Sequence, residues 1–235
     1  MEKVTLENLG LIEYQKGWDY QEKLCKQNVD IKLTQRKNAD FSEETKHHIL
    51  VCEHPLVYTL GKSGDESHLL AEQNTLKELG ITYYKINRGG DITHHGPGQL
   101  VVYPILDLEK FFTDIHKYLR FLEEAVIRTL REYGIESGRY EGFTGVWLDV
   151  DDPQRVRKIC AMGIRCSRWI TMHGLALTVN NDLSFFDNII PCGISDRQVT
   201  SLEKEIGQKV NLNEVTYKLL HHLSELFNFK LVETP

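Results

Sequence analysis

The stretch RGGDITHHGPGQLVVYPILDL, residues 88–108, places four glycines, two adjacent histidines and an arginine directly ahead of a continuous apolar run. Gly89 and Gly90 permit backbone conformations closed to other residues, and they let a ligand approach the main chain closely. The other two glycines flank Pro97 and predict a tight turn into a strand at about 99–106. A glycine-rich hairpin without a ligand and a ligand-binding loop are both compatible with this spacing. A Walker loop and a dinucleotide fingerprint are not, because no G-K-[ST] is present and no G-x-G-x-x-G opens a helix.

Composition indicates one globular domain with a sizeable core. The chain has 235 residues, of which 41% are hydrophobic and 26% charged, and no repeat or Pro/Gly/Ser-rich linker divides it. We therefore expect a single domain over residues 1–235. The net charge of -6 argues against a nucleic-acid partner. Because the sequence has no long apolar span and no leader composition, we also expect no membrane association and a cytoplasmic location.

The hydrophobic pattern predicts an α/β domain in which a central mixed sheet is flanked by helices. A polar loop is expected at 30–46, between a helix at 12–27 and the strand-forming run 47–61, which Pro55 divides. The remaining helices are expected at 67–79, at 114–133 and after a capping box formed by Asn211 and Glu214. The remaining strands are expected at 81–86, 99–106, 145–150, 156–165 and 169–179, with a hairpin turn at DDPQ.

The five cysteines are irregularly spaced and odd in number, which predicts reduced thiols and not a disulfide framework. Cys192 lies between a proline and a glycine in IIPCGIS, a context typical of an exposed loop thiol. Cys25 and Cys52 lie in regular elements and are expected in the core.

Lys158 has unusual neighbours in the predicted strand 156–165. Alternation of side chains places it on one face with Cys160, Met162 and Ile164. Loss of hydration there favours a neutral amine that can accept a proton. The alternative is a lysine at a strand end whose ammonium reaches water.

His173 lies in the next predicted strand, 169–179, where it is a polar residue among apolar neighbours, as Lys158 is in strand 156–165. Alternation places it on one face with apolar residues, which makes a hydrogen-bonded core histidine the simplest interpretation. The residues that share its predicted face are Leu175, Leu177 and Val179. Its spacing from Cys160 and Cys166 matches none of the paired-ligand patterns of zinc sites, so no metal is expected.

Several motifs, taken together and in order, resemble the lipoyl(octanoyl) transferases. They are EHPLVYTLG at 53–61, the stretch 88–108, KICAMGIRCSRWITMHGLALTVNNDLSFFDNIIPCG at 158–193 and VTSLEKEIG at 199–207. The resemblance implies a domain similar to the catalytic domains of biotin and lipoate protein ligases. It also implies a two-step acyl transfer that needs neither ATP nor another cofactor.

In such enzymes a cysteine takes octanoyl from octanoyl-acyl carrier protein and passes it to a lysine of a lipoyl domain. The acceptors implied are lipoyl domains of 2-oxoacid dehydrogenase E2 subunits and the glycine cleavage H protein. The nucleophile falls on Cys192, and the lysine that lowers its pKa falls on Lys158. This agrees with the chemistry, since thioester exchange requires a thiolate.

The resemblance also assigns residues that bind the substrate. They are Arg88, Gly89, Gly90, Asp91, Ile92, Thr93, His94, His95, Ala161, Met162, Gly163, Gly174, Leu175 and Ala176. We expect His95 and His173 near the developing oxyanion. His54 is expected as a further pocket residue, with a structural role as the alternative.

Two departures from the family pattern are minor. His94 stands where an aromatic residue is common, and Cys160 and Cys166 replace small apolar residues. Cys160 and Cys166 add oxidisable thiols near the site.

The partners implied are usually acidic, as this chain is, so docking requires a local basic patch. The candidate patch comprises Arg155, Arg157, Lys158, Arg165 and Arg168, with a solvated strand edge as the alternative.

Three other functions are alternatives to the transferase. An ATP-dependent lipoate or biotin ligase shares the fold but does not need Cys192, and its loop typically has three adjacent glycines. A cysteine-dependent amidotransferase would move octanoyl between lipoyl-type domains. A catalytically silent carrier-binding module would bind without forming an acyl adduct.

Overall fold

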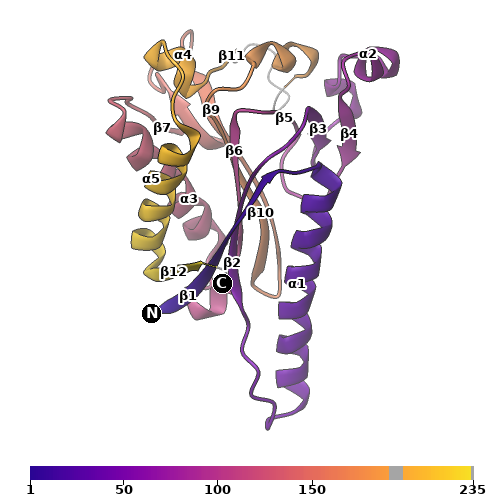
Figure 1. Ribbon diagram of the computed structural model, residues 1–235, viewed down its shortest axis with the longest axis vertical. Coiled ribbons are helices and arrows are strands. Elements are labelled where there is room, and N and C mark those ends of the chain that lie inside the picture. Colours follow the sequence, from indigo (N-terminus) through magenta and orange to yellow (C-terminus); the bar gives the residue numbers. More distant parts are fainter. Residues whose placement is uncertain (191–197, 234–235) are drawn as a thin grey trace.

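The computed structural model describes residues 1–190 and 198–233, and its centre is a mixed β-sheet (Figure 1). In the described residues the strand order is β12-β1-β2-β6-β10-β9-β8-β7, with β11 paired to β9. These strands are β1 (Glu2–Leu11), β2 (His47–Glu53), β6 (Gln99–Ile105), β7 (Gly138–Tyr140), β8 (Phe143–Leu148), β9 (Arg157–Ser167), β10 (Ile170–Thr178), β11 (Gln198–Val199) and β12 (Phe229–Glu233).

A second, smaller sheet lies beside one end of the main sheet and carries part of the glycine-rich stretch (Figure 1). Its order is β4 (Thr82–Lys85), β3 (Val57–Leu60) and β5 (Ile92–His95). Residues 88–91 therefore join β4 to β5 within the small sheet, and residues 96–98 lead from β5 into β6 of the main sheet.

Helices cover both faces of the main sheet (Figure 1). α1 (Tyr14–Lys37) packs on one face, whereas α3 (Ile115–Glu132) and α5 (Leu212–Phe227) pack on the other and bury the larger core. The short helices are η1 (Glu66–His68), α2 (Gln73–Glu78), η2 (Leu108–Lys110), η3 (Leu183–Asn188) and α4 (Leu202–Ile206). None of the helices in residues 1–190 and 198–233 is long and apolar enough to cross a membrane.

The predicted α/β class with a mixed sheet is confirmed, and α3 agrees with its pattern. Leu122, Val126 and Leu130 are fully buried, and the side chain of Asp114 caps the helix by accepting from the N–H of Lys117. Gly134 follows the helix with a φ of 74°, the left-handed conformation expected of a glycine there.

Two predictions of local structure were wrong, and one strand was not predicted. α1 does not end at 27 but runs to Lys37, through part of the predicted loop 30–46. β1 was not expected, because among its residues only Val4 is fully buried and alternation is weak. The helix expected at 67–79 is divided into η1 and α2.

The last helix starts at the predicted cap, although the capping box is incomplete. Asn211 accepts from the N–H groups of Asn213 and Glu214, as expected. The Glu214 carboxylate, however, pairs with Lys218 at 2.9 Å and not with the backbone of the cap.

Buried polar contacts explain why α1 continues through a polar sequence. Lys32 lies on the buried face of α1, and its Nζ is 2.7 Å from Asp107 Oδ1 and 2.9 Å from Glu109 Oε2. One turn earlier, Asn28 bonds to both the N–H and the C=O of Lys46. These contacts attach the helix to the sheet where apolar residues are few.

We predict that Asp107→Asn destabilises the fold by about 3 kcal/mol, because it leaves the Lys32 ammonium buried with one partly exposed partner. Urea denaturation measures the change. Lys16→Met, which breaks an exposed ion pair with Glu13 on the same helix, serves as the control and should leave stability unchanged. Equal, small effects of the two substitutions would contradict a role for the buried pair.

Candidate active site

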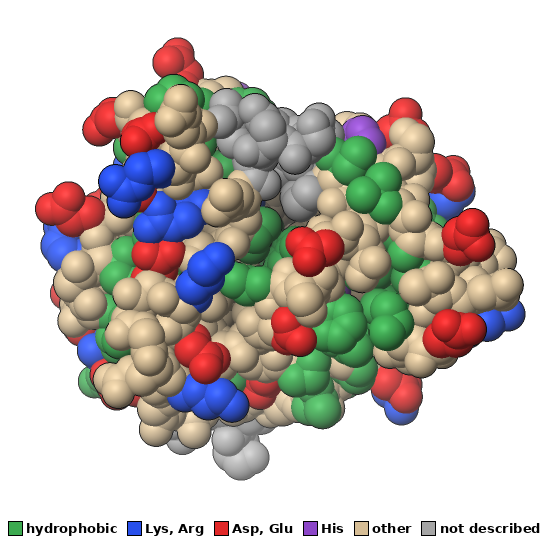
Figure 2. All heavy atoms as spheres, turned by 90° about the horizontal axis from the view of Figure 1, so that it is seen from above, with side chains coloured by type: hydrophobic (Ala, Val, Ile, Leu, Met, Phe, Trp, Pro, Cys, Tyr) green, Lys and Arg blue, Asp and Glu red, His purple; other side chains and the backbone are tan. Residues whose placement is uncertain are grey.

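A cavity of about 480 Å³ lies between the glycine-rich loop and the strands β9 and β10. Figure 2 looks down on this side of the molecule and shows apolar side chains in its middle, with Lys and Arg side chains gathered to the left. Of the predicted site residues, the cavity is lined by Arg88, Gly89, Gly90, Asp91, Ile92, Thr93, His95, Lys158, Ala161, Met162, Gly163, His173, Gly174, Leu175 and Ala176. The fold therefore brings residues 88–95 together with the consecutive strands β9 and β10, which lie more than 60 positions later in the sequence.

Close backbone contacts hold the loop against the edge of β9. The N–H of Gly89 donates to the carbonyl of Ile164 at 2.8 Å. A Cβ at Gly163 would lie 2.5 Å from the Gly89 carbonyl oxygen, and one at Gly61 would lie 2.1 Å from that of Gly90. Only glycine fits at both positions, because the atoms in the way belong to the backbone. Main-chain groups of the loop thereby form one wall of the cavity.

Arg88 is buried, and its guanidinium holds the loop in place. It donates to the carbonyl oxygens of Thr59, Asp91 and Gly89 at 2.8, 2.8 and 3.0 Å, and to the Thr59 hydroxyl at 3.0 Å. The structure thus gives Arg88 a structural task, and its predicted contact with the substrate stays a prediction.

Lys158 lies in β9 with 7% of its surface exposed, as its apolar neighbours predicted. Its Nζ is 4.5 Å from the centre of the Trp147 ring, whose residue is its cross-strand partner in β8. The sequence pattern did not single out Trp147, although the predicted hairpin at DDPQ places β8 beside β9. Lys158 is therefore held inside the cavity and does not extend to the surface.

Cys192 lies outside the described residues, but the segment that follows it is placed beside Lys158. In β11, Val199 pairs with Lys158, and the N–H of Thr200 donates to the Lys158 carbonyl at 2.9 Å. This register attaches the chain after residue 197 to the strand that carries the lysine.

An aromatic group that was not predicted forms the floor of the cavity. The Tyr14 ring stacks on His95, with ring centres 5.8 Å apart, and Tyr103 lies alongside. His54 is not among the described lining residues. It lies behind them, since its Nδ1 donates to the Ile12 carbonyl and its Nε2 accepts from the Tyr103 hydroxyl. This geometry favours the structural role of His54 that was the alternative interpretation.

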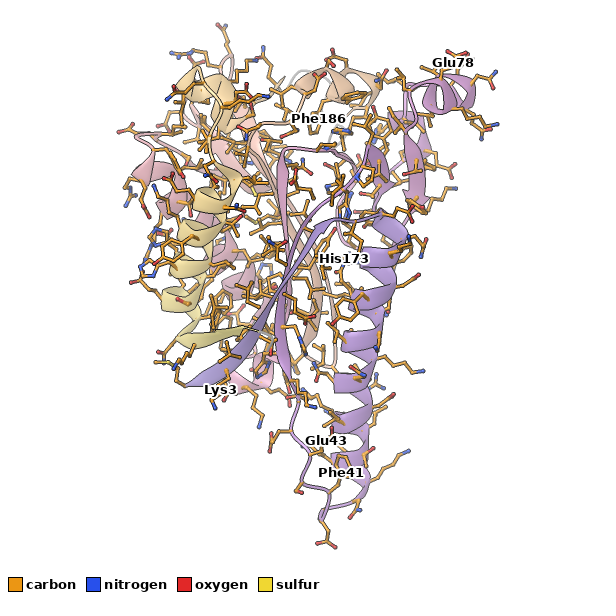
Figure 3. The ribbon with its side chains drawn as sticks, in the orientation of Figure 1. Lys3, Phe41, Glu43, Glu78, His173 and Phe186 are labelled. Carbon is orange, nitrogen blue, oxygen red and sulfur yellow. The ribbon has the colours of Figure 1, made fainter. Side chains whose placement is uncertain are left out.

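His173 differs from its predicted orientation. Its φ of 58° breaks the strand alternation, and its Nε2 bonds to Asn87 Oδ1 at 2.9 Å. Asn87 also bonds to Glu22 of α1, so His173 faces the α1 layer and not the core that contains Leu175 (Figure 3). The alternation rule failed here because it assumes regular strand backbone.

Burial keeps the two cavity histidines neutral. It lowers the pKa of His173 to about 3 and that of His95 well below its usual value, and the Arg88 charge acts in the same direction on both. Each neutral ring donates its N–H within the protein, His95 to Gln99 and His173 to Asn87. This arrangement does not support the expected donation to an oxyanion, which would require a second ring proton.

His94, predicted to bind substrate, does not line the cavity in the part that the structure describes. Its ring stacks on Phe185 with centres 5.3 Å apart and contacts Phe186 and Tyr58. Because β5 alternates, His94 and His95 point to opposite faces of the small sheet. His94 thus occupies an aromatic position, consistent with the departure from the family pattern noted above.

The cysteines named with His173 do not converge on a metal site. Cys160 is fully buried in the core below α3, Cys166 is half-buried, and His173 faces α1. Among residues 1–190 and 198–233, ligand atoms come together only at His221, His222 and Glu225 on α5, outside the cavity lining.

The predicted basic patch is largely neutralised. Arg157 makes two 2.7 Å contacts with Glu205 and also pairs with Asp149. Arg165 pairs with Glu22 at 2.8 Å, and Lys158 is buried. Arg157 and Arg165 lie near opposite ends of β9, so these side chains do not form one continuous surface.

Comparisons with known proteins identify the family. The model of the lipoyl protein ligase A/B catalytic domain matches residues 13–224. An octanoyltransferase of Christiangramia forsetii is 60% identical over 230 residues, which cover 97% of each chain. The chain belongs to the lipoyl(octanoyl) transferase family. An octanoyltransferase of Flavobacterium johnsoniae, 58% identical over 98% of this chain and 99% of its own, agrees. The family recognised from the motifs is confirmed, and it is a family of acyltransferases.

Solved structures show that the fold is shared with ligases. A lipoate protein ligase of Thermoplasma acidophilum matches with a TM-score of 0.71 and 18% identity, covering all of this chain and 87% of its own. A biotin protein ligase of Aquifex aeolicus matches with a TM-score of 0.52 and 16% identity, over 97% of this chain and 70% of its own. The predicted likeness to ligase catalytic domains is thereby confirmed for the fold.

We predict that His94→Phe stabilises the protein, and does so more at low pH. Both ring nitrogens of His94 are buried without partners among the described residues, so Phe should gain about 1 kcal/mol at pH 7. Burial lowers the pKa of His94 to about 4, so below pH 6.5 the unfolded chain binds a proton that the folded chain does not. Folded stability is lost as pH falls through this range, and the gain from Phe should be about 2 kcal/mol larger at pH 5. Urea denaturation at both pH values measures this, and a gain independent of pH would contradict a buried neutral His94.

Proposed function

We propose that this protein transfers octanoyl from octanoyl-acyl carrier protein to a lysine of lipoyl domains, through a thioester on Cys192. The observation that carries the proposal is Lys158, buried in the wall of an apolar-lined cavity and paired with the strand that follows the Cys192 segment. Membership of the octanoyltransferase family and the name of the relatives support the same reaction.

In the first half-reaction the Cys192 thiolate attacks the carbonyl carbon of the donor thioester. Lys158 accepts the thiol proton, and the bond between the acyl carbon and the carrier sulfur breaks. The released carrier thiolate then takes a proton from the Lys158 ammonium. Octanoyl is left on Cys192 and Lys158 is neutral.

In the second half-reaction the acceptor lysine amine attacks the Cys192 thioester. Lys158 takes the proton that the amine loses, and Cys192 leaves as a thiolate. An amide forms and a thioester breaks, so no nucleotide is consumed. The thiolate and the ammonium are restored together, ready for the next donor.

The walls of the cavity fit an alkyl chain better than a nucleotide. Small and apolar residues line it, namely Ala161, Met162 and Gly163 of β9 and Leu175 and Ala176 of β10. Among its described lining residues the cationic side chains are Arg88 and Lys158, and the Arg88 guanidinium already donates to loop carbonyls. A triphosphate would call for more positive charge than this. The ATP-dependent ligase is therefore the second candidate.

The acceptors in this proposal are lipoyl domains of 2-oxoacid dehydrogenases and the glycine cleavage H protein. No cofactor takes part, because the acyl group arrives on the phosphopantetheine arm of the carrier. A transferase that moves octanoyl between two lipoyl-type domains would use the same residues and differ only in its donor.

The direct test is the intact mass of the protein after incubation with octanoyl-acyl carrier protein without ATP. We expect a hydroxylamine-labile octanoyl increment on the native chain and none on Cys192→Ser. If no adduct forms and modification of a lipoyl domain requires ATP and free octanoate, the protein is an ATP-dependent ligase and not a transferase. If only an octanoylated lipoyl domain loads Cys192, the protein is an amidotransferase.

Lys158→Met tests the proton-transfer role. The aliphatic stem that packs near Trp147 is kept and the amine is lost, so the fold should persist while Cys192 acylation slows by about 10²- to 10⁴-fold. Stopped reactions analysed by mass spectrometry give the rate. Acylation at the native rate in a folded Lys158→Met protein would remove Lys158 from the mechanism.

A further inference from the structure

We propose that His68 and Asp91 form a positioning pair that connects the glycine-rich loop to residues 188–190, which precede the Cys192 segment. The inference rests on the proposed function and adds to it a pair outside Cys192 and Lys158. One residue, His68, makes both connections. Its backbone binds the chain just before residue 191, and its imidazole binds the loop.

The backbone connection is a short antiparallel contact. The N–H of Ile190 donates to the His68 carbonyl at 2.8 Å, and the N–H of Leu70 donates to the Asn188 carbonyl at 2.9 Å. Between these bonds, Leu69 and Ile189 pair as a β-bridge. Ile190 precedes Cys192 by two residues, so this contact sets where that segment begins.

The side-chain connection reaches the cavity wall. His68 Nδ1 lies 2.6 Å from Asp91 Oδ2, a charge-assisted contact between side chains that are 25% and 13% exposed. The other carboxylate oxygen accepts from the N–H of Ile92 at 2.7 Å. Asp91 therefore has both oxygens engaged within the protein, which assigns it a positioning role, and its predicted contact with substrate stays a prediction.

The elements on both sides of the pair are themselves fixed. Asp65 caps η1 by accepting from the N–H of Ser67. The Tyr58 hydroxyl donates to the Phe185 carbonyl at 2.6 Å and holds η3, whose Phe186 lines the cavity (Figure 3). A shift of His68 would thus move a cavity residue and the start of the Cys192 segment together.

A matched ion pair on the same turn gives the control. Glu66 of η1 pairs with Lys85 of β4, but both side chains are exposed and neither lines the cavity. Glu66→Gln removes a charge from η1 without breaking the connection to the loop.

The test compares His68→Ala, Asp91→Asn, their combination and Glu66→Gln. For each single variant of the pair we expect the rate constant of Cys192 acylation at saturating octanoyl-acyl carrier protein to fall about tenfold, with little change in the donor KM. The double variant should be no slower than either single variant, because both remove one interaction. Glu66→Gln should match the native rate.

Two further measurements separate positioning from general stability. The exchanged pair, His68→Asp with Asp91→His, should recover most of the rate. Hydrogen exchange at the Ile190 amide should accelerate about tenfold in Asp91→Asn and remain native in Glu66→Gln. This readout does not depend on catalysis, so it decides the inference even if the native protein forms no adduct and the proposed function fails.

Additive losses, no recovery in the exchanged pair, or unchanged exchange at Ile190 would overturn the inference. The inference would also be overturned if the loss of rate in each variant simply matched its loss of thermal stability.

Discussion

The approach of two glycine backbones, Gly89 on the loop and Gly163 on β9, is the contact on which the rest of the site depends. A Cβ at Gly163 would meet the Gly89 carbonyl oxygen at 2.5 Å, and the Gly89 N–H is bonded to Ile164. This contact fixes where the loop between β4 and β5 lies against β9. One wall of the cavity therefore forms where a loop and a strand lie closer than any side chain permits.

Several polar groups around the cavity already have hydrogen-bond partners within the protein, which limits the number of groups that can act on a bound substrate. Arg88 donates to the carbonyls of Thr59, Gly89 and Asp91, and the N–H groups of His95 and His173 donate to side-chain amides. Burial keeps the imidazoles neutral, so they add no charge to the cavity. Lys158 is a basic group of the cavity wall and pairs with the strand that follows the Cys192 segment, consistent with a reaction whose main demand is proton transfer at sulfur and nitrogen.

Sequence patterns were most informative where one residue determines the backbone or one periodicity holds. The glycines of 88–98, the apolar stripe of α3 and the order of the motifs all predicted what the structure and the relatives show. They were least informative where distant contacts decide the outcome. α1 extends to Lys37 because Lys32 finds Asp107, 75 residues away, and no local pattern records that pairing. His173 was misplaced because one positive φ reverses an otherwise regular alternation.

No sequence pattern predicted the aromatic residues beside the cavity or the contact between His68 and Asp91. Tyr14, Tyr103 and Trp147 look like ordinary core aromatics until the fold places them beside His95 and Lys158. A hairpin register could have indicated Trp147, since it faces Lys158 across β8 and β9. No comparable signal joins His68 to Asp91, which come from a 3₁₀ turn and a loop.

The measurement that tests the account most directly is a crystal structure of the protein loaded with octanoyl on Cys192. The account predicts that the alkyl chain lies between the glycine-rich loop and the strands β9 and β10, against Ala161 and Ala176, with the Lys158 amine near the thioester. An acyl chain bound elsewhere, or a thioester remote from Lys158, would contradict it.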